Sequence, residues 1–154
     1  MERVIQKLIE DNKTISTMES CTGGGIVNAI TNIPNASKVI KFSAVTYSNE
    51  FKIKMGVSSE LIDKYSVYSI EVAREMAKTI SLFTNSNYGI GVTGKLKKID
   101  ENNLSSEDDV VFLSIYDCDT KKYYDSKIKL QFDTREDNKK QIIDNFIQLF
   151  LKIK

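Results

Sequence analysis

Apolar residues recur at two different spacings along this chain. A spacing of three and four positions, typical of one face of a helix, marks an opening segment, a segment after a glycine run, a long central segment and the closing segment. The side chains that carry this spacing are Val4, Ile5, Leu8 and Ile9; Ile26, Val27 and Ile30; Val72, Ala73, Met76, Ala77 and Ile80; and Ile142, Ile143, Phe146, Leu149, Phe150 and Ile153. Ser58 or Ser59 can cap a short helix through Ile62, and Ser69 can cap the central one.

Other stretches alternate between apolar and polar positions or are rich in β-branched and aromatic residues, as strands are. They cover residues 14–18, 39–47, 88–93, 110–116 and 123–132. The last two are joined by Asp117-Cys118-Asp119-Thr120, a turn-forming composition that predicts an antiparallel hairpin. Residues 95–109 are polar, show no apolar period and are expected to form a mobile loop.

Helices that alternate with strands, followed by a hairpin, predict an α/β fold. We expect a three-layer α/β/α sandwich around a mixed, mostly parallel sheet. The length of 154 residues fits one domain that spans residues 1–154. The patterns do not determine the order of the strands.

The composition excludes several classes of protein. The chain contains no histidine, which removes Ser-His-Asp triads, Cys-His dyads and HExxH zinc sites. With 22 basic and 21 acidic residues, the net charge of +1 provides no field for nonspecific binding to nucleic acid. The apolar runs are too short to span a membrane, and two cysteines without a CxxC pair fit a reducing compartment. We expect a cytoplasmic protein with no metal, no organic cofactor, no nucleic-acid partner and no membrane association.

The first candidate for chemistry is the run Ser20-Cys21-Thr22-Gly23-Gly24, where a strand passes into a helix. Unpaired backbone N–H groups at such a turn suit an oxyanion or a phosphate. The alternative is structural, with Ser20 or Thr22 as the helix cap and the glycines permitting the turn. Cys21 is a rival nucleophile, although a small buried role is expected because no histidine can act as its partner.

The second candidate is the run Val45-Thr46-Tyr47-Ser48-Asn49-Glu50-Phe51-Lys52, at the end of an expected strand. A lysine can act as a base if burial lowers its pKa, because desolvation disfavours the charged ammonium. Ser20 and Lys52 are therefore candidates for a dyad. The alternative for Lys52 is a surface lysine with a solvated head.

Three runs together resemble the C-terminal domain of the CinA competence/damage-inducible family. They are Thr17-Met18-Glu19-Ser20-Cys21-Thr22-Gly23-Gly24, the run from Val45 to Lys52, and Met55-Gly56-Val57. Weaker similarity continues through residues 33–37, 67–77 and 92–94, so the resemblance covers nearly the whole chain. It implies a stand-alone, divergent member that lacks the separate N-terminal domain of longer relatives, and a homo-oligomer.

Members of this family include nicotinamide-nucleotide amidohydrolases. The resemblance implies a small-molecule nucleotide substrate, nicotinamide mononucleotide, whose carboxamide is hydrolysed to nicotinic acid mononucleotide and ammonia. Ser20 matches the family's nucleophile, Lys52 its base and Tyr47 a tyrosine beside the dyad. The positions that the resemblance assigns to substrate binding are Thr22, Gly23, Gly24, Asn49, Thr93, Gly94, Arg135 and Lys139, with Arg135 or Lys139 at the phosphate.

The chain departs from the family after Thr93-Gly94. The family continues there into a glycine- and proline-rich loop, whereas this chain reads Lys95-Leu96-Lys97-Lys98-Ile99-Asp100. Long side chains replace close backbone approach, so we expect phosphate binding to depend on Lys95, Lys97 or Arg135. Two alternatives stay open: a catalytically weak or inactive member that binds a nucleotide or a protein partner, and an amidase for another small substrate.

Overall fold

One five-stranded sheet organises the molecule, for which a computed structural model describes residues 1–96 and 109–154. The strands are β1 (Ile15–Glu19), β2 (Ile40–Val45), β3 (Tyr88–Gly94), β4 (Val110–Asp117) and β5 (Lys122–Lys129). Their order is β2-β1-β3-β4-β5. β1 pairs in parallel with β2 and β3, and β4 pairs antiparallel with β3 and β5, so β4 alone among them runs in the opposite direction. The expected mixed, mostly parallel sheet and the hairpin are confirmed.

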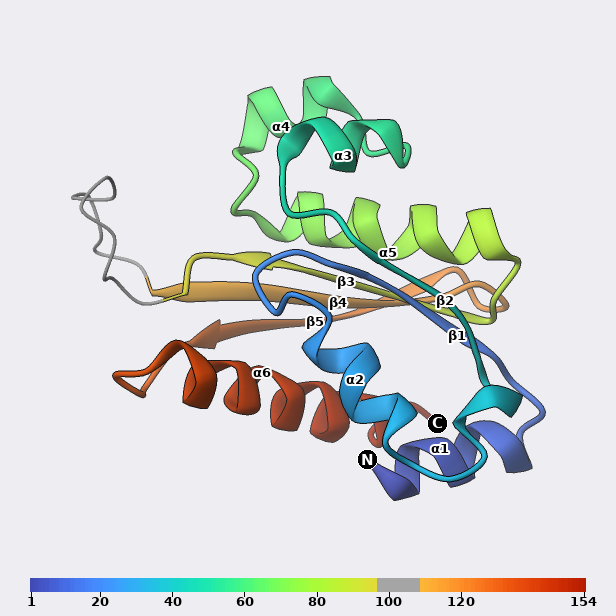
Figure 1. The fold of residues 1–154 in the computed structure, drawn as a ribbon. Helices are drawn as coiled ribbons and strands as arrows, with labels where there is room; N and C mark the ends of the chain where they lie inside the picture. Colours follow the sequence, from blue (N-terminus) through green and yellow to red (C-terminus); the bar gives the residue numbers. More distant parts are fainter. Residues whose placement is uncertain (97–108) are drawn as a thin grey trace.

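Helices cover both faces of this sheet (Figure 1). One face carries α1 (Glu2–Glu10), α2 (Gly25–Thr31) and α6 (Arg135–Phe150); the other carries α3 (Asn49–Lys54), α4 (Ser59–Tyr65) and α5 (Ile70–Thr84). A short 3-10 helix, η1 (Ala36–Lys38), leads into β2. The three-layer sandwich is therefore confirmed. Among the described residues, no helix combines the length and the apolar character needed to cross a bilayer.

Each face of the sheet has its own apolar core. Beneath α1, α2 and α6, buried side chains of the sheet such as Ile90 and Leu113 pack with Phe146 of α6. Beneath α5, the core is smaller and the helix lies very close to β3. A Cβ added at Gly89 would lie 1.9 Å from the carbonyl oxygen of Ala77, so only glycine permits this approach.

The expected helices and caps agree closely with the structure. Ser58 Oγ accepts a hydrogen bond from Leu61 N, and Ser69 Oγ accepts one from Val72 N, both at 3.3 Å. Most of the loop expected over residues 95–109 lies outside the described residues, and Lys97 lies there too.

The last strand is shorter than its sequence pattern predicts. The pattern predicts a strand that reaches Phe132, whereas β5 ends at Lys129. Beyond Lys129, the side chain of Asn138 in α6 forms two hydrogen bonds with the backbone of Phe132. Its Oδ1 accepts from Phe132 N at 3.0 Å, and its Nδ2 donates to Phe132 O at 2.8 Å. A side-chain amide thus replaces the strand ladder, which ends the strand before its apolar pattern does.

Candidate active site

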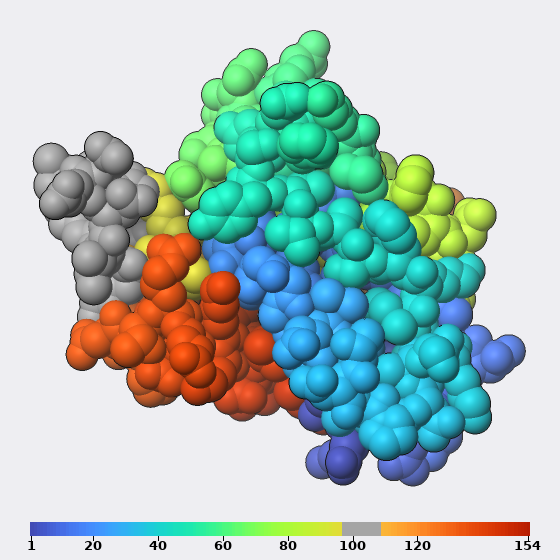
Figure 2. Space-filling view, in the orientation of Figure 1, coloured from blue at the N-terminus to red at the C-terminus, as the bar shows by residue number. Residues whose placement is uncertain are grey.

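The candidate site lies at the end of β1, between β2 and β3. In the sheet, Glu19 is paired with Val45 of β2 and Val92 of β3. The next residue, Ser20, donates a backbone hydrogen bond to Val92 O at 3.1 Å. Because β1 and β2 are parallel, the segments that follow them emerge at the same edge of the sheet. Figure 2 shows these two segments, blue and teal, meeting the orange start of α6 on one face of the molecule.

Lys52 and Ser20 form a direct contact at this edge. Lys52 Nζ donates to Ser20 Oγ at 3.1 Å and to the carbonyl oxygen of Thr46 at 2.7 Å. The Lys52 side chain is 1% exposed, so the alternative of a solvated surface lysine is wrong. Burial lowers the pKa of Lys52 below its ordinary value, because the charged ammonium has lost its hydration. The pair has the spacing that a nucleophile and its base require.

A helix that the sequence pattern did not predict carries Lys52 into the site. Phe51 and Ile53 alternate with polar residues and extend the appearance of a strand, yet residues 49–54 form α3. Ser48 caps this helix, since its Oγ accepts from Phe51 N at 3.3 Å. The helical turn leaves Phe51 and Ile53 exposed and directs Lys52 inward.

A buried glutamate, which the sequence analysis did not single out, holds the turn after β1. The Glu19 side chain is fully buried. Its Oε2 accepts from Thr22 Oγ1 at 2.6 Å and from Ile26 N at 3.0 Å, and its Oε1 accepts from Val27 N at 2.8 Å. Two of the N–H groups at the start of α2, which have no partner within the helix, therefore donate to the Glu19 carboxylate. The available signal was an acidic residue directly between a strand and a glycine turn that opens a helix.

Neither Ser20 nor Thr22 caps α2, so the capping part of the structural alternative is wrong. The N-cap is Gly24, and Ser20 lies before it in the turn. Gly23 and Gly24 have φ values of 61° and 89°, a left-handed conformation that favours glycine. The backbone N–H groups of Thr22 and Gly24 have no acceptor among the described residues. These two donors belong to the turn that follows Ser20 and are available to a ligand.

Cys21 has the buried role expected of it. Its side chain is 5% exposed and belongs to the larger apolar core. Burial raises the pKa of its thiol to about 12. Near neutral pH the thiol stays protonated, so Cys21 is a poor nucleophile compared with the Ser20–Lys52 pair.

Basic residues of α6 approach the turn from the exposed side. A Cβ atom added at Gly23 would lie 3.5 Å from Lys139 Nζ, so this ammonium group is next to the turn. Arg135 Nη2 donates to the hydroxyl of Tyr47 at 3.4 Å. Tyr47 is 66% exposed, and within the described chain its hydroxyl contacts neither member of the dyad through a hydrogen bond. Asn49 is an exposed residue at the start of α3.

Thr93 and Gly94 have structural partners at the end of β3. Thr93 Oγ1 donates to the carbonyl oxygen of Val67 at 2.9 Å, which ties β3 to the segment before α5. A Cβ at Gly94 would lie 2.6 Å from the carbonyl oxygen of Val110, so glycine permits the close approach of β4. Substrate contact by these two residues stays a prediction.

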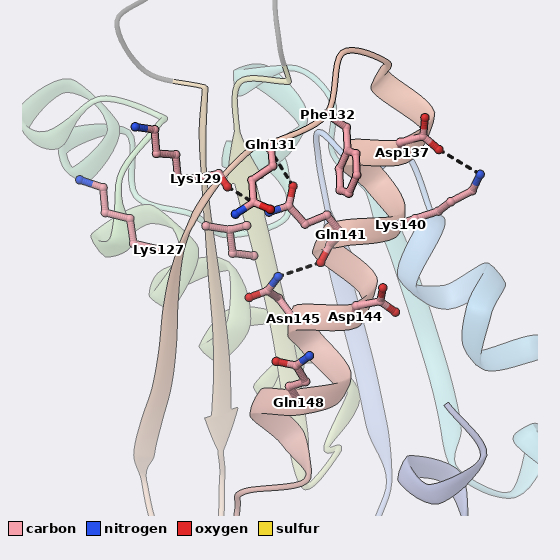
Figure 3. Close-up of a pocket in the computed structure, with 11 residues that line it drawn as sticks. Lys127, Lys129, Gln131, Phe132, Asp137, Lys140, Gln141, Asp144, Asn145 and Gln148 are labelled. Carbon is pink, nitrogen blue, oxygen red and sulfur yellow. Dashed lines mark hydrogen bonds and ion pairs between the residues drawn. The ribbon is translucent and has the colours of Figure 1, made fainter.

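Two described cavities lie away from the dyad. The larger, about 550 Å³, lies between β5 and α6 (Figure 3). The β5 side chains Lys127 and Lys129 point away from α6 in this view, and Asp137 pairs with Lys140. A smaller cavity of about 250 Å³ is lined by Ser66, Tyr68, Lys95, Val110, Phe112 and Lys127. In residues 1–96 and 109–154, no cluster of three acidic, cysteine or histidine side chains is placed to hold a metal ion.

Comparisons with known proteins agree on one family. The sequence model of the CinA C-terminal domain matches residues 1–153. A competence-damage inducible protein, as its name describes it, from Clostridium perfringens strain SM101 is 46% identical over 96 residues. The match covers 61% of this chain and 23% of that protein. A CinA-like protein of Endomicrobium trichonymphae is 37% identical over 143 residues, covering 92% of this chain and 32% of that protein. The chain thus spans less than a third of the length of either relative.

Solved structures share the fold. A CinA superfamily protein from Escherichia coli superposes with a TM-score of 0.89 at 23% identity, covering 99% of this chain and 87% of that one. The competence/damage inducible protein CihA from Agrobacterium tumefaciens gives a TM-score of 0.82 at 25% identity, covering 96% and 94%. The α/β architecture around the dyad is therefore that of a group of solved proteins.

Proposed function

The chain belongs to the CinA C-terminal domain family, and on that premise we propose that it is an amidohydrolase that deamidates nicotinamide mononucleotide. The products are nicotinic acid mononucleotide and ammonia. The observation that carries the proposal is the 3.1 Å contact between Lys52 Nζ and Ser20 Oγ, made by a lysine that is 1% exposed. A buried lysine beside a serine hydroxyl is an arrangement that supports nucleophilic catalysis without histidine.

Lys52 acts first as a base. Its lowered pKa increases the fraction of neutral amine near neutral pH. One amine N–H donates to Thr46 O at 2.7 Å and orients the amine. In the neutral amine the lone pair accepts from the Ser20 hydroxyl, which reverses the direction of the 3.1 Å hydrogen bond. As Lys52 takes this proton, Ser20 Oγ forms a bond to the carboxamide carbon, and the carbonyl electron pair moves onto oxygen.

The turn after β1 then stabilises the tetrahedral intermediate. The backbone N–H groups of Thr22 and Gly24 donate to the oxyanion. When the intermediate collapses, the C–N bond breaks and the Lys52 ammonium gives its proton to the leaving nitrogen, which departs as ammonia. The acyl group remains as an ester on Ser20. Water activated by Lys52 attacks this ester, releases the carboxylic acid and returns the proton to Ser20.

The phosphate of the substrate binds on the α6 side in this proposal. Lys139 lies beside Gly23 in the nucleophile's turn, and Arg135 reaches Tyr47 in the segment that leads to Lys52. An arginine can bind phosphate through two parallel hydrogen bonds, and a lysine adds a point charge.

A second candidate is a member that binds a pyridine nucleotide without turning it over. Two observations favour it: the hydroxyl of Thr93 is already bound to Val67 O, and lysine-rich sequence follows Gly94 in place of the family's glycine-rich loop. Both concern the recognition of substrate and leave the Ser20–Lys52 contact untouched.

Ammonia release from nicotinamide mononucleotide by the purified protein separates the two candidates. We expect steady release by the unmodified protein and by Cys21→Ala, and none above background by Ser20→Ala. Calorimetry with the same nucleotide measures binding independently. Binding without ammonia release would replace the proposal with the second candidate, and full activity in Ser20→Ala would remove the serine mechanism.

A further inference from the structure

Glu19 links the two members of the dyad through separate atoms. Its side chain holds the nucleophile's turn through Thr22 Oγ1 and the backbone N–H groups of Ile26 and Val27. Its backbone carbonyl accepts from Thr46 N at 2.8 Å, and the carbonyl of Thr46 accepts from Lys52 Nζ at 2.7 Å. One residue therefore braces both the turn that carries Ser20 and the segment that orients Lys52.

We propose that Glu19 is a positioning residue that sets Ser20 against Lys52. Its kinetic consequence rests on the proposed function. Glu19 immediately precedes Ser20, and its carboxylate receives three hydrogen bonds from the residues that follow, which closes the chain into one compact turn. A fourth hydrogen bond to the carboxylate comes from Thr17 Oγ1, two residues earlier in β1, at 3.2 Å. Ser20 thus lies between two anchored segments and has little freedom to move away from the amine.

The Glu19 carboxylate also determines which backbone N–H groups of the turn stay available to substrate. It occupies the N–H groups of Ile26 and Val27, which an anionic group of a ligand would otherwise compete for. The N–H groups of Thr22 and Gly24, nearer to Ser20 in sequence, have no acceptor among the described residues. The arrangement directs the substrate's reacting oxygen to the turn and its phosphate to the α6 side.

A glutamine cannot reproduce this set of contacts. Both carboxylate oxygens accept from a backbone N–H, one from Ile26 and the other from Val27. An amide has one accepting oxygen and one donating NH2 group, so either orientation of Glu19→Gln places a donor against a backbone donor. The substitution is nearly isosteric, which separates the loss of a contact from the loss of volume.

The test combines kinetics with a crystal structure of Glu19→Gln. We expect kcat to fall about a hundredfold with KM nearly unchanged, because a displacement of about 1 Å at a reacting group has an effect of this size. In the crystal structure, we expect the turn to shift and the Ser20–Lys52 hydrogen bond to be lost. Glu60→Gln, at an exposed glutamate in the first turn of α4, removes the same charge and should behave like the unmodified protein.

Two other variants keep the test decisive if Glu19→Gln does not fold. Thr22→Val removes the 2.6 Å hydrogen bond to Glu19 and should lower kcat, whereas Thr22→Ser keeps the hydroxyl and should restore most of it. An intact dyad with normal kcat in Glu19→Gln, or equal rates in Thr22→Val and Thr22→Ser, would overturn the inference. If the unmodified protein releases no ammonia, the proposed function fails, and the Ser20–Lys52 distance in Glu19→Gln still decides the role of Glu19.

Discussion

The two sides of the proposed site are built differently. On the dyad side, formed by Glu19, Ser20 and Lys52, the side chains are 0%, 8% and 1% exposed. Ser20 and Lys52 are hydrogen-bonded to each other, and the Glu19 carboxylate is hydrogen-bonded to the turn that follows it. On the α6 side, formed by Tyr47, Arg135 and Lys139, Tyr47 is 66% exposed and meets Arg135 over 3.4 Å. Buried, fully bonded groups hold their geometry before substrate arrives, whereas exposed side chains adjust when it binds. We therefore expect the first side to determine kcat and the second to determine KM.

The largest effect is expected on the dyad side. Lys52→Ala and Ser20→Ala should each lower kcat at least roughly thousandfold, and the double variant should be little worse, because the members of one catalytic unit are not additive. The measurement is kcat for ammonia release by all three variants. Lys54→Ala, an exposed lysine of the same helix α3, is the matched control and should keep its activity. Multiplicative losses in the double variant would contradict a shared mechanism.

The pH dependence of activity should report the state of Lys52. Since the neutral amine is the base, kcat/KM should rise about tenfold per pH unit below an apparent pKa and then level off. Burial lowers the pKa of Lys52, so the plateau should begin below the ordinary lysine value of 10.5. A flat profile, or one that still rises at pH 10.5, would contradict the role of Lys52 as base.

Unfolding experiments can check the same pKa shift without substrate. The pKa of Lys52 is lower in the folded state, so between the folded and unfolded pKa values the unfolded chain binds the extra proton. In that window, folded stability should rise with pH relative to Lys52→Met, and below it the difference should stay constant. Urea unfolding of both proteins at several pH values measures this difference.

Much of the fold could be predicted because local patterns agree with tertiary packing. Ser69 caps α5 as its sequence predicts, and the apolar residues that the spacing marks are buried on one face of that helix. The exception is α3, where Phe51 and Ile53 alternate like strand residues although both are exposed. A capping serine and the buried position of Lys52 outweigh that alternation, and the burial of a lysine is not readable from its neighbours in sequence.

The site could be predicted only in part. The absence of histidine and two short motifs made Ser20 and Lys52 candidates for a dyad, and the resemblance assigned their roles. The structure places their side chains within hydrogen-bonding distance. Glu19 was not predicted, although an acidic residue between a strand and a glycine turn is a signal for such a role. Its main partners are backbone N–H groups of α2, whose positions depend on the fold. The same limit applies to Thr93, whose partner is the carbonyl of Val67.

A smaller effect is expected on the α6 side. Arg135→Ala and Lys139→Ala should each raise KM for nicotinamide mononucleotide about tenfold with little change in kcat, which is the loss of one charge-assisted hydrogen bond. The increase should shrink at high salt, because screening already weakens these contacts in the unmodified protein. Lys140→Ala is the control, since that exposed lysine pairs with Glu136 and Asp137. A fall in kcat alone would show that the α6 side shares in the chemistry.

The smallest effect is expected at Cys21, which belongs to the dyad side by position alone. It follows Ser20 in sequence, but its buried thiol has a pKa raised to about 12 and should react very slowly with a thiol reagent near neutral pH. Cys118 is partly exposed and should be modified first in the native protein, while both cysteines should react after unfolding. Mass spectrometry of the labelled peptides and ammonia release by the labelled protein measure this directly. Modification of Cys21 in the folded state with loss of activity would mean that the turn opens, and the contrast between a fixed dyad side and an adjustable α6 side would no longer hold.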